Sequence, residues 1–282
     1  MLAYDITQEE FKKIAKFVYD QVGIHLADHK INLVRSRLSK RLRHFGFNSF
    51  SEYYDYLVHE ESGEELIMFT NEISTNVTSF FREPSQWDYL QKEIKNIEAN
   101  NRDKKLRIWS AACSSGQEPI TIAIFLLTNL KNPNSWDIKI LATDISEDIL
   151  RKAISGTYSM EDVKGLPKNT LSKFFDKVQE QTKFGSATMY RVKQYIKDMI
   201  TFRKFNLVNS SYSIIKPNTF DMVFCRNVMI YFDKETKTNV VLNLLSKIKV
   251  NGHFFIGHSE SLVTMSKGDI KLQSPSIYKK IK

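Results

Sequence analysis

The chain has 282 residues, a comfortable length for two domains, and its 42% hydrophobic and 26% charged residues are typical of a folded protein rather than a disordered one. Residues 1–10 are polar and acidic, so we expect no secretion signal there. The most apolar run, residues 120–130, is far shorter than the roughly 20 residues that span a bilayer. The net charge of +9 favours an acidic partner: nucleic acid, a membrane surface or an acidic protein.

The cysteine content excludes disulfide-stabilised and zinc-binding proteins from the expected classes. Cys113 and Cys225 are too few for a disulfide framework or a CxxC metal site. We expect each to pack as a small buried apolar side chain rather than to act as a nucleophile. The sequence therefore predicts a reduced, cytoplasmic protein without a metal site.

The first hundred residues have apolar side chains at helical spacing, and no strand pattern interrupts them. Gly46 is the expected end of one helix, and Ser49 with Glu52 forms a Ser-x-x-Glu capping box for the next. We expect helices over residues 11–22, 31–45, 49–58, 64–73 and 84–97. These helices predict an all-α N-terminal domain over residues 1–83 and a linker helix within 84–104.

Between these helices lies the polar segment 76–83, with the sequence NVTSFFRE. Ser, Thr and Asn residues interrupt helices and make either caps or ligand loops. Taken alone, the pattern favours a simple helix junction with Arg82 paired to a surface acid.

Residues 105–282 alternate between strand and helix patterns. Expected strands cover residues 106–109, 138–142, 220–225 and 253–256, with helices over 119–130 and 234–248 between them. This alternation predicts an α/β domain with a parallel sheet covered by helices on both faces. Alternation over residues 189–192, after a Gly-Ser turn signal, predicts a small β-insertion at about 175–200.

Ligands of open α/β sheets bind beyond the carboxyl ends of the strands. The loop 110–119 follows the first expected strand and has one glycine, Gly116, so it lacks the fingerprint of a nicotinamide-dependent dehydrogenase. Asp144 ends the next strand, where a carboxylate can accept both hydroxyls of a ribose. The alternative is an N-cap for the helix that starts at Ser146. Its position in the sheet order favours the ribose role.

Polar residues also follow the strand 220–225. Core packing explains the apolar residues of this segment, but Asn227 and Tyr231 are less well explained, because polar groups near a sheet end need partners. They are candidates for the same ligand site.

Five segments together resemble the CheR-type chemotaxis receptor methyltransferases: NVTSFFRE (76–83), RIWSAACSSGQEP (107–119), LATDIS (141–146), CRNVMIYFD (225–233) and GHSES (257–261). They occur in order, at the family's spacing, over nearly the whole chain. The resemblance implies an all-α domain followed by a Rossmann-like class I methyltransferase domain. It also implies S-adenosylmethionine as cofactor, S-adenosylhomocysteine as product, and methylation of glutamate side chains of chemotaxis receptors.

The same resemblance implies site roles. The cofactor-binding residues would be Asn76, Thr78, Arg82, Ala111, Gln117, Asp144, Asn206, Leu207, Asn227 and Val228. Arg82 and Tyr231 would hold the acceptor carboxylate, and His258 has no expected role. The family usually has an acid where this chain has Gln117. A charge-assisted bond to the cofactor's ammonium is worth about 1.5–3 kcal/mol, so we expect lower cofactor affinity.

Four basic residues fall on one flank of the helix 31–45 and its start: Lys30, Arg37, Arg41 and His44. They form either a solvated helix side or, as the resemblance implies, a docking surface for acidic receptor helices. We expect a monomer that does not insert into membranes. A nucleic-acid methyltransferase is disfavoured, because no basic patch is interleaved with aromatic residues. A non-catalytic cofactor-sensing module of the same fold is the alternative, and Gln117 is the feature that favours it.

Overall fold

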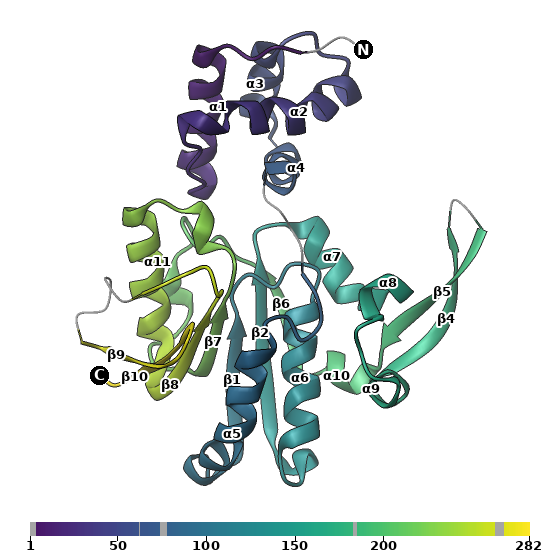
Figure 1. Ribbon diagram of the computed structural model, residues 1–282, viewed down its shortest axis with the longest axis vertical. Coiled ribbons are helices and arrows are strands. Elements are labelled where there is room, and N and C mark those ends of the chain that lie inside the picture. The colour runs from purple at the N-terminus through teal and green to yellow at the C-terminus, as the bar shows by residue number, and fades with distance from the viewer. Residues whose placement is uncertain (1–3, 62, 74–77, 183–184, 263–267) are drawn as a thin grey trace. The chain divides into compact units, whose positions relative to one another are not determined.

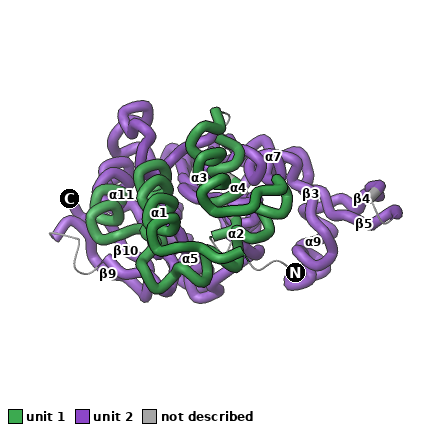
Figure 2. The backbone as a smooth tube through the Cα atoms, turned by 90° about the horizontal axis from the view of Figure 1, so that it is seen from above, with its two compact units in different colours: residues 1–77, 231–240 green, residues 78–230, 241–282 purple. Residues whose placement is uncertain are grey.

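The computed structural model describes residues 4–61, 63–73, 78–182, 185–262 and 268–282. The chain divides into two compact units, coloured separately in Figure 2. The first unit comprises residues 1–77 and 231–240, and the second comprises residues 78–230 and 241–282. Within the described ranges, no helix is both long enough and apolar enough to cross a membrane.

The first unit is helical, as predicted. Gly46 adopts a left-handed φ of 74° and ends the second helix, and the Ser49 hydroxyl accepts from the Glu52 N–H at 3.2 Å. These contacts confirm the expected stop and cap. The helices are α1 (Gln8–Val22), α2 (Ile31–Phe45), α3 (Phe50–His59) and α4 (Glu64–Ile73), with a 3-10 turn at Asp28–Lys30.

A buried carboxylate joins three of these helices. The Glu65 side chain on α4 is only 3% exposed, and it forms an ion pair with Arg41 on α2, whose Nε donates to Oε1 at 3.0 Å. Tyr53 on α3 donates its hydroxyl to the same Oε1 at 2.7 Å. Because an unpaired buried charge is costly, Arg41 is a structural partner of Glu65 within this unit.

The second unit contains a mixed sheet with helices packed on it (Figure 1). Its helices are α5 (Pro84–Asn100), α6 (Gln117–Asn129), α7 (Glu147–Ser155), α8 (Met160–Val163), α9 (Lys168–Phe174), α10 (Gln194–Lys197) and the end of α11 (Lys234–Lys247). Its strands are β1 (Lys105–Ser110), β2 (Asp137–Asp144), β3 (Thr157–Tyr158), β4 (Phe175–Thr182), β5 (Gly185–Val192), β6 (Ile200–Lys204), β7 (Phe220–Cys225), β8 (Ile248–Ile256), β9 (Ile270–Ser274) and β10 (Ile277–Lys280).

Seven strands in the described part of the chain form the main sheet in the order β6-β2-β1-β7-β8-β10-β9. The pairs from β6 to β8 are parallel, which confirms the predicted α/β class. The pairs of β10 with β8 and with β9 are antiparallel, so the sheet is mixed and not purely parallel as expected. Both β9 and β10 are short, and most residues of β9 face solvent. Neither strand has the apolar run that marks a buried strand in the sequence.

The predicted β-insertion is present as a second, antiparallel sheet in the order β3-β5-β4. β4 and β5 pair along their full length and extend away from the main sheet as a hairpin (Figure 1). Its base is held by aromatic contacts, because Phe80 lies edge-on to both Tyr158 and Phe175 at 5.0 and 5.6 Å between ring centres.

Helix α5, expected to link two domains, belongs to the core of the second unit. Its apolar stripe includes Trp87, which stacks on Phe224 of β7 at 5.9 Å between ring centres. Of the two compact units, the first includes residues up to 77 and the second includes α5. Residues 231–240 also return to the first unit, where Tyr19 donates its hydroxyl to Asp233 at 2.7 Å.

Replacing Arg41 by alanine is expected to destabilise the first unit, because Glu65 would lose its cationic partner. Breaking a buried ion pair in this way costs about 3–5 kcal/mol. Denaturant unfolding followed by circular dichroism measures the loss. The control is Arg35→Ala on the same helix, whose exposed pair with Asp5 is worth at most about 1 kcal/mol. Equal stabilities of the two variants would contradict the structural role of Arg41.

Candidate functional site

The parallel strands of the described sheet end at one edge. Ser110 of β1 lies beside Ala142 of β2 and Phe224 of β7, and Cys225 lies beside Ile256 of β8. The loops that follow these strands are therefore neighbours. This edge is where ligands of open α/β sheets bind.

The loop after β1 is held close to the sheet. Ala111 N–H donates to the Phe224 carbonyl and Cys113 N–H to the Thr143 carbonyl, both at 2.8 Å. Gly116 has a φ of 93°, and a Cβ there would lie 2.9 Å from the Tyr158 hydroxyl. Only glycine fits this position, which directs the N-terminus of α6 toward the strand ends. Both cysteines are buried, as predicted, and burial raises the pKa of Cys113, which leaves its thiol protonated.

Asp144 ends β2 and joins the two loops. Its Oδ2 accepts from the Ser114 N–H at 2.9 Å and its Oδ1 from the Ser146 N–H at 3.1 Å. Burial raises the pKa of Asp144, although these backbone donors act in the opposite direction. The helix-cap alternative is wrong, because Ser146 itself caps α7 by accepting from Ile149 N–H. Each carboxylate oxygen has a second lone pair, so Asp144 can accept further hydroxyl donors.

Gln117 is the first residue of α6 and is 4% exposed. Its Oε1 accepts from the Ser115 hydroxyl at 2.8 Å. The amide oxygen therefore already accepts a hydrogen bond within its own loop, and the side chain brings no charge to the site.

A buried guanidinium lies at the end of β7, between two carboxylates. The Arg226 side chain is 3% exposed; its Nη1 lies 3.1 Å from Glu118 Oε2 and its Nη2 3.2 Å from Glu83 Oε2. The Ser110 hydroxyl donates to the other oxygen of Glu118 at 2.7 Å. Burial raises the pKa of Glu118, and Arg226 opposes that shift. We call Glu83, Glu118 and Arg226 the Arg226 triad.

The triad has no role among the sequence-based predictions. Its members stand inside the segments 76–83, 107–119 and 225–233, next to residues that were assigned. The sequence feature that could have indicated the triad is Arg226, a charged residue directly after a buried apolar strand. A charge in such a place must have partners.

The structure brings several of the other predicted residues to the same edge. Asn206 and Leu207 follow β6, and the Phe205 N–H donates to the Asp144 carbonyl at 3.0 Å, which places this turn beside Asp144. Asn206 Oδ1 accepts from the Val208 N–H at 2.9 Å, so this side chain shapes its own turn. Asn227 follows Arg226 directly, in a left-handed conformation with φ 59°.

For the remaining predicted residues within the described ranges, the structure gives the burial or the unit to which each belongs. Thr78, Arg82 and Val228 are half-buried in the second unit. Tyr231 belongs to the first unit, where its carbonyl accepts from the His25 N–H at 2.8 Å. Asn76 lies outside the described residues.

The basic flank of α2 is not uniform. Arg37 donates to the Glu72 carbonyl at 2.8 Å, and Arg41 pairs with Glu65 as described. Lys30 is half-buried, whereas His44 is exposed. A partner would reach the exposed members most directly, and contact with a partner stays a prediction for all four.

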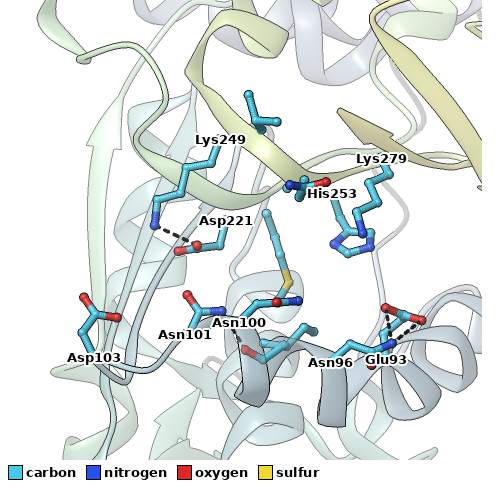
Figure 3. A pocket seen from close by; sticks show the side chains of 14 residues that line it. Glu93, Asn96, Asn100, Asn101, Asp103, Asp221, Lys249, His253 and Lys279 are labelled. Atoms are coloured by element: carbon cyan, nitrogen blue, oxygen red, sulfur yellow. Dashed lines mark hydrogen bonds and ion pairs between the residues drawn. The ribbon is translucent and has the colours of Figure 1, made fainter. Parts of the chain in front are cut away.

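A polar cleft of about 590 Å³ lies at the opposite end of the sheet (Figure 3). Asp221, at the start of β7, pairs there with Lys249 at 2.7 Å. His253 also lines the cleft, where burial lowers its pKa to about 4. This cleft lies at the amino end of β7, far along the strand from Arg226.

Family models match almost the whole chain. The model described as the CheR methyltransferase S-adenosylmethionine-binding domain matches residues 76–277, and the CheR methyltransferase all-alpha domain matches residues 9–74. Together with the α/β sheet and its loops, these matches define an S-adenosylmethionine-dependent methyltransferase. The chain belongs to the CheR methyltransferase family, which confirms the resemblance seen in the sequence.

Curated relatives agree over the full length. The chain is 38% identical to a chemotaxis protein methyltransferase of Borreliella burgdorferi, over 99% of this chain and 96% of that one. It is 34% identical to the chemotaxis protein methyltransferase of Salmonella typhimurium, over 97% and 90%. A chemotaxis protein methyltransferase 2 of Pseudomonas aeruginosa is 37% identical, over 93% and 90%.

The residues at this edge fit that cofactor. Glu83, Glu118 and Asp144 bring three carboxylates together with one buried guanidinium, and a sulfonium with an ammonium suits such surroundings. Asp144 retains acceptor capacity for ribose hydroxyls. The ribose role of Asp144 and the place of Gln117 at the methionine end stay predictions, which the two experiments below test.

Asp144→Asn is expected to weaken binding of S-adenosylhomocysteine at least about tenfold, or about 1.4 kcal/mol, because an amide accepts two hydroxyls poorly. Calorimetry measures the affinity. The matched control is Asp137→Asn at the other end of β2, where the exposed carboxylate pairs with Arg107. Unchanged affinity in a folded Asp144→Asn protein would remove this residue from the site.

Gln117→Glu is expected to tighten S-adenosylhomocysteine binding at least about tenfold, because it adds a charge-assisted bond to the ligand's ammonium. The reference ligand is methylthioadenosine, which lacks the amino-acid end and should bind both proteins equally. If both ligands gained equally, or neither gained, Gln117 would not lie at the ammonium.

Proposed function

We propose that this protein transfers the methyl group of S-adenosylmethionine to glutamate side chains of chemotaxis receptors in the cytoplasm, forming glutamyl methyl esters. The observation that carries the proposal is the match of both CheR domain models along one chain, supported by full-length relatives named chemotaxis protein methyltransferases. We further propose that the protein acts as a monomer and does not use nucleic acid as substrate.

The chemistry needs little from the protein beyond placement. Bound S-adenosylmethionine supplies an already activated methyl group. A glutamate carboxylate, with a reference pKa of about 4.3, is ionised at neutral pH and needs no general base. Positioning of two reactants contributes roughly 7–11 kcal/mol to such reactions.

Arg82 and Tyr231 are our candidates to hold the acceptor carboxylate. A carboxylate stripped of water is costly unless charged or polar donors replace its hydration. Arg82 offers a guanidinium and Tyr231 a hydroxyl. Both side chains are half-buried in their own units, so each retains surface for a substrate group. They would orient the nucleophile without removing its charge.

Receptor docking is proposed for α2. Acidic receptor helices would meet the basic residues of this helix, and charges at the rim of an interface mainly raise the association rate. His44 is exposed and makes no ion pair among the described residues, which makes it a suitable position for a test. Arg41 is less suitable because its removal also disturbs Glu65.

Gln117 favours one competing function, that of a cofactor-binding module without catalysis. Loss of the charged contact lowers affinity but leaves Asp144, Arg82 and the Arg226 triad in place. The two functions differ in a direct way, because only the enzyme transfers label to a protein.

The test is incubation with methyl-labelled S-adenosylmethionine and receptor-containing membranes, scored as base-labile label released as methanol. Arg82→Ala and Tyr231→Phe should lower kcat far more than they weaken S-adenosylhomocysteine binding, by at least about tenfold more. His44→Glu should raise the apparent KM for receptor and leave kcat largely unchanged.

A folded wild-type protein that binds cofactor but labels no receptor would favour the binding module. If Arg82→Ala changed only cofactor affinity, Arg82 would have no role in holding the acceptor.

A further inference from the structure

The main chain around Arg82 adopts a conformation that its own residues do not favour. Phe81 and Glu83, on either side, have φ angles of 51° and 60°, in the left-handed region that a Cβ disfavours. Such backbone persists only where the surrounding structure holds it, and it concentrates at functional sites. The contacts of this segment therefore indicate how Arg82 is positioned.

Two donors fix the Arg82 carbonyl. Arg226 Nη2 donates to it at 2.5 Å and Trp87 Nε1 at 3.0 Å. One residue earlier, the Phe81 N–H donates to Thr121 Oγ1 of α6 at 3.2 Å. The segment is thus tied to α5, to α6 and to the end of β7. None of these contacts uses the Arg82 side chain.

The Glu83 carboxylate joins three loops. Its Oε2 accepts from Arg226, with Nε at 3.3 Å and Nη2 at 3.2 Å. Its Oε1 accepts from the His258 N–H at 3.0 Å and from Asn227 Nδ2 at 3.4 Å. Only 9% of this side chain is exposed, so loss of these partners would leave a largely buried carboxylate uncompensated.

We propose that Glu83 and Arg226, with Glu118 as the second carboxylate, form a clasp that positions Arg82 for methyl transfer. The proposal rests on the proposed function of Arg82. Glu83 and Arg226 are positioning residues, because they hold the main chain beside the acting group. The same carboxylate also sets the side chain of Asn227, so the clasp orients the acceptor and cofactor sides together.

Two variants weaken the clasp with little change in size. Glu83→Gln keeps an acceptor oxygen but removes the charge that faces Arg226. Arg226→Lys keeps the charge, but one ammonium cannot reproduce the fork that bonds Glu83, Glu118 and the Arg82 carbonyl together.

The matched control is Asp221→Asn on β7, the strand that Arg226 follows. Its carboxylate is 13% exposed and pairs with Lys249 at the amino end of β7 (Figure 3). Asp221 also accepts from the Arg107 N–H at 2.8 Å. This variant therefore removes the charge of a similarly shielded carboxylate at the opposite end of β7 from Arg226.

Hydrogen–deuterium exchange tests the clasp without any methyl transfer. In Glu83→Gln and Arg226→Lys, peptides that cover residues 78–83 and 257–261 should exchange at least about fivefold faster. Asp221→Asn should leave both peptides unchanged. Exchange that stays at the wild-type rate in the clasp variants, or rises equally in the control, overturns the proposal.

A double-mutant cycle tests whether the clasp acts through Arg82. Glu83→Gln should lower the single-turnover transfer rate at least about tenfold, with the affinity for S-adenosylhomocysteine changed less than about threefold. In the Arg82→Ala background, Glu83→Gln should cause no further loss. A full additional loss there would show that Glu83 acts independently of Arg82. A wild-type protein without transfer would contradict the proposed function, and the exchange result would still decide the clasp.

Discussion

Charge balance at the carboxyl end of the sheet constrains the second unit. Glu83 and Glu118 share the Arg226 guanidinium, whereas Asp144 is satisfied by the N–H groups of Ser114 and Ser146. Glu260 accepts from two backbone N–H groups in the same region. Buried carboxylates with so little compensating positive charge are tolerated only with a dense set of donors. This arrangement disfavours an anionic ligand and suits a cationic one such as a sulfonium.

Local signals predicted the elements better than their assembly. Helix ends followed from Gly46 and from the Ser49 cap, which act within one turn of chain. The apolar stripe of α5 was visible, but its destination in the second unit depends on Trp87 meeting Phe224, a contact between distant segments. The return of residues 231–240 to the first unit likewise depends on a contact between distant segments, that of Tyr19 with Asp233. The antiparallel pair β9 and β10 carried too little apolar pattern to be recognised.

In the candidate site, too, positions within one segment were predicted, whereas contacts between distant segments were not. The position of Asp144 at the end of β2 was predicted correctly, and the helix-cap alternative is wrong because Ser146 caps α7. Its contact with a ribose stays a prediction. The Arg226 triad was not found, because Arg226 is 143 residues from Glu83 and 108 from Glu118 in the chain. A lone charged residue predicts that partners exist but not which ones. For the basic flank of α2, the sequence predicted the shared helix face but not the partners. Helical spacing did not show that Arg41 pairs with a buried acid of its own unit.

The charge balance also bears on the order of binding under the proposed function. An acceptor glutamate brings negative charge to a region already rich in carboxylates, so its approach is unfavourable until a cationic cofactor is bound. Methyl transfer then replaces a sulfonium and a carboxylate by a neutral thioether and a neutral ester, and this removes the attraction that held the reactants together. The ammonium of the product remains, and an acid at position 117 would still retain it. If Gln117 lies at the ammonium, as proposed, its lack of charge would also weaken the hold on the spent cofactor and favour its exchange for a fresh one.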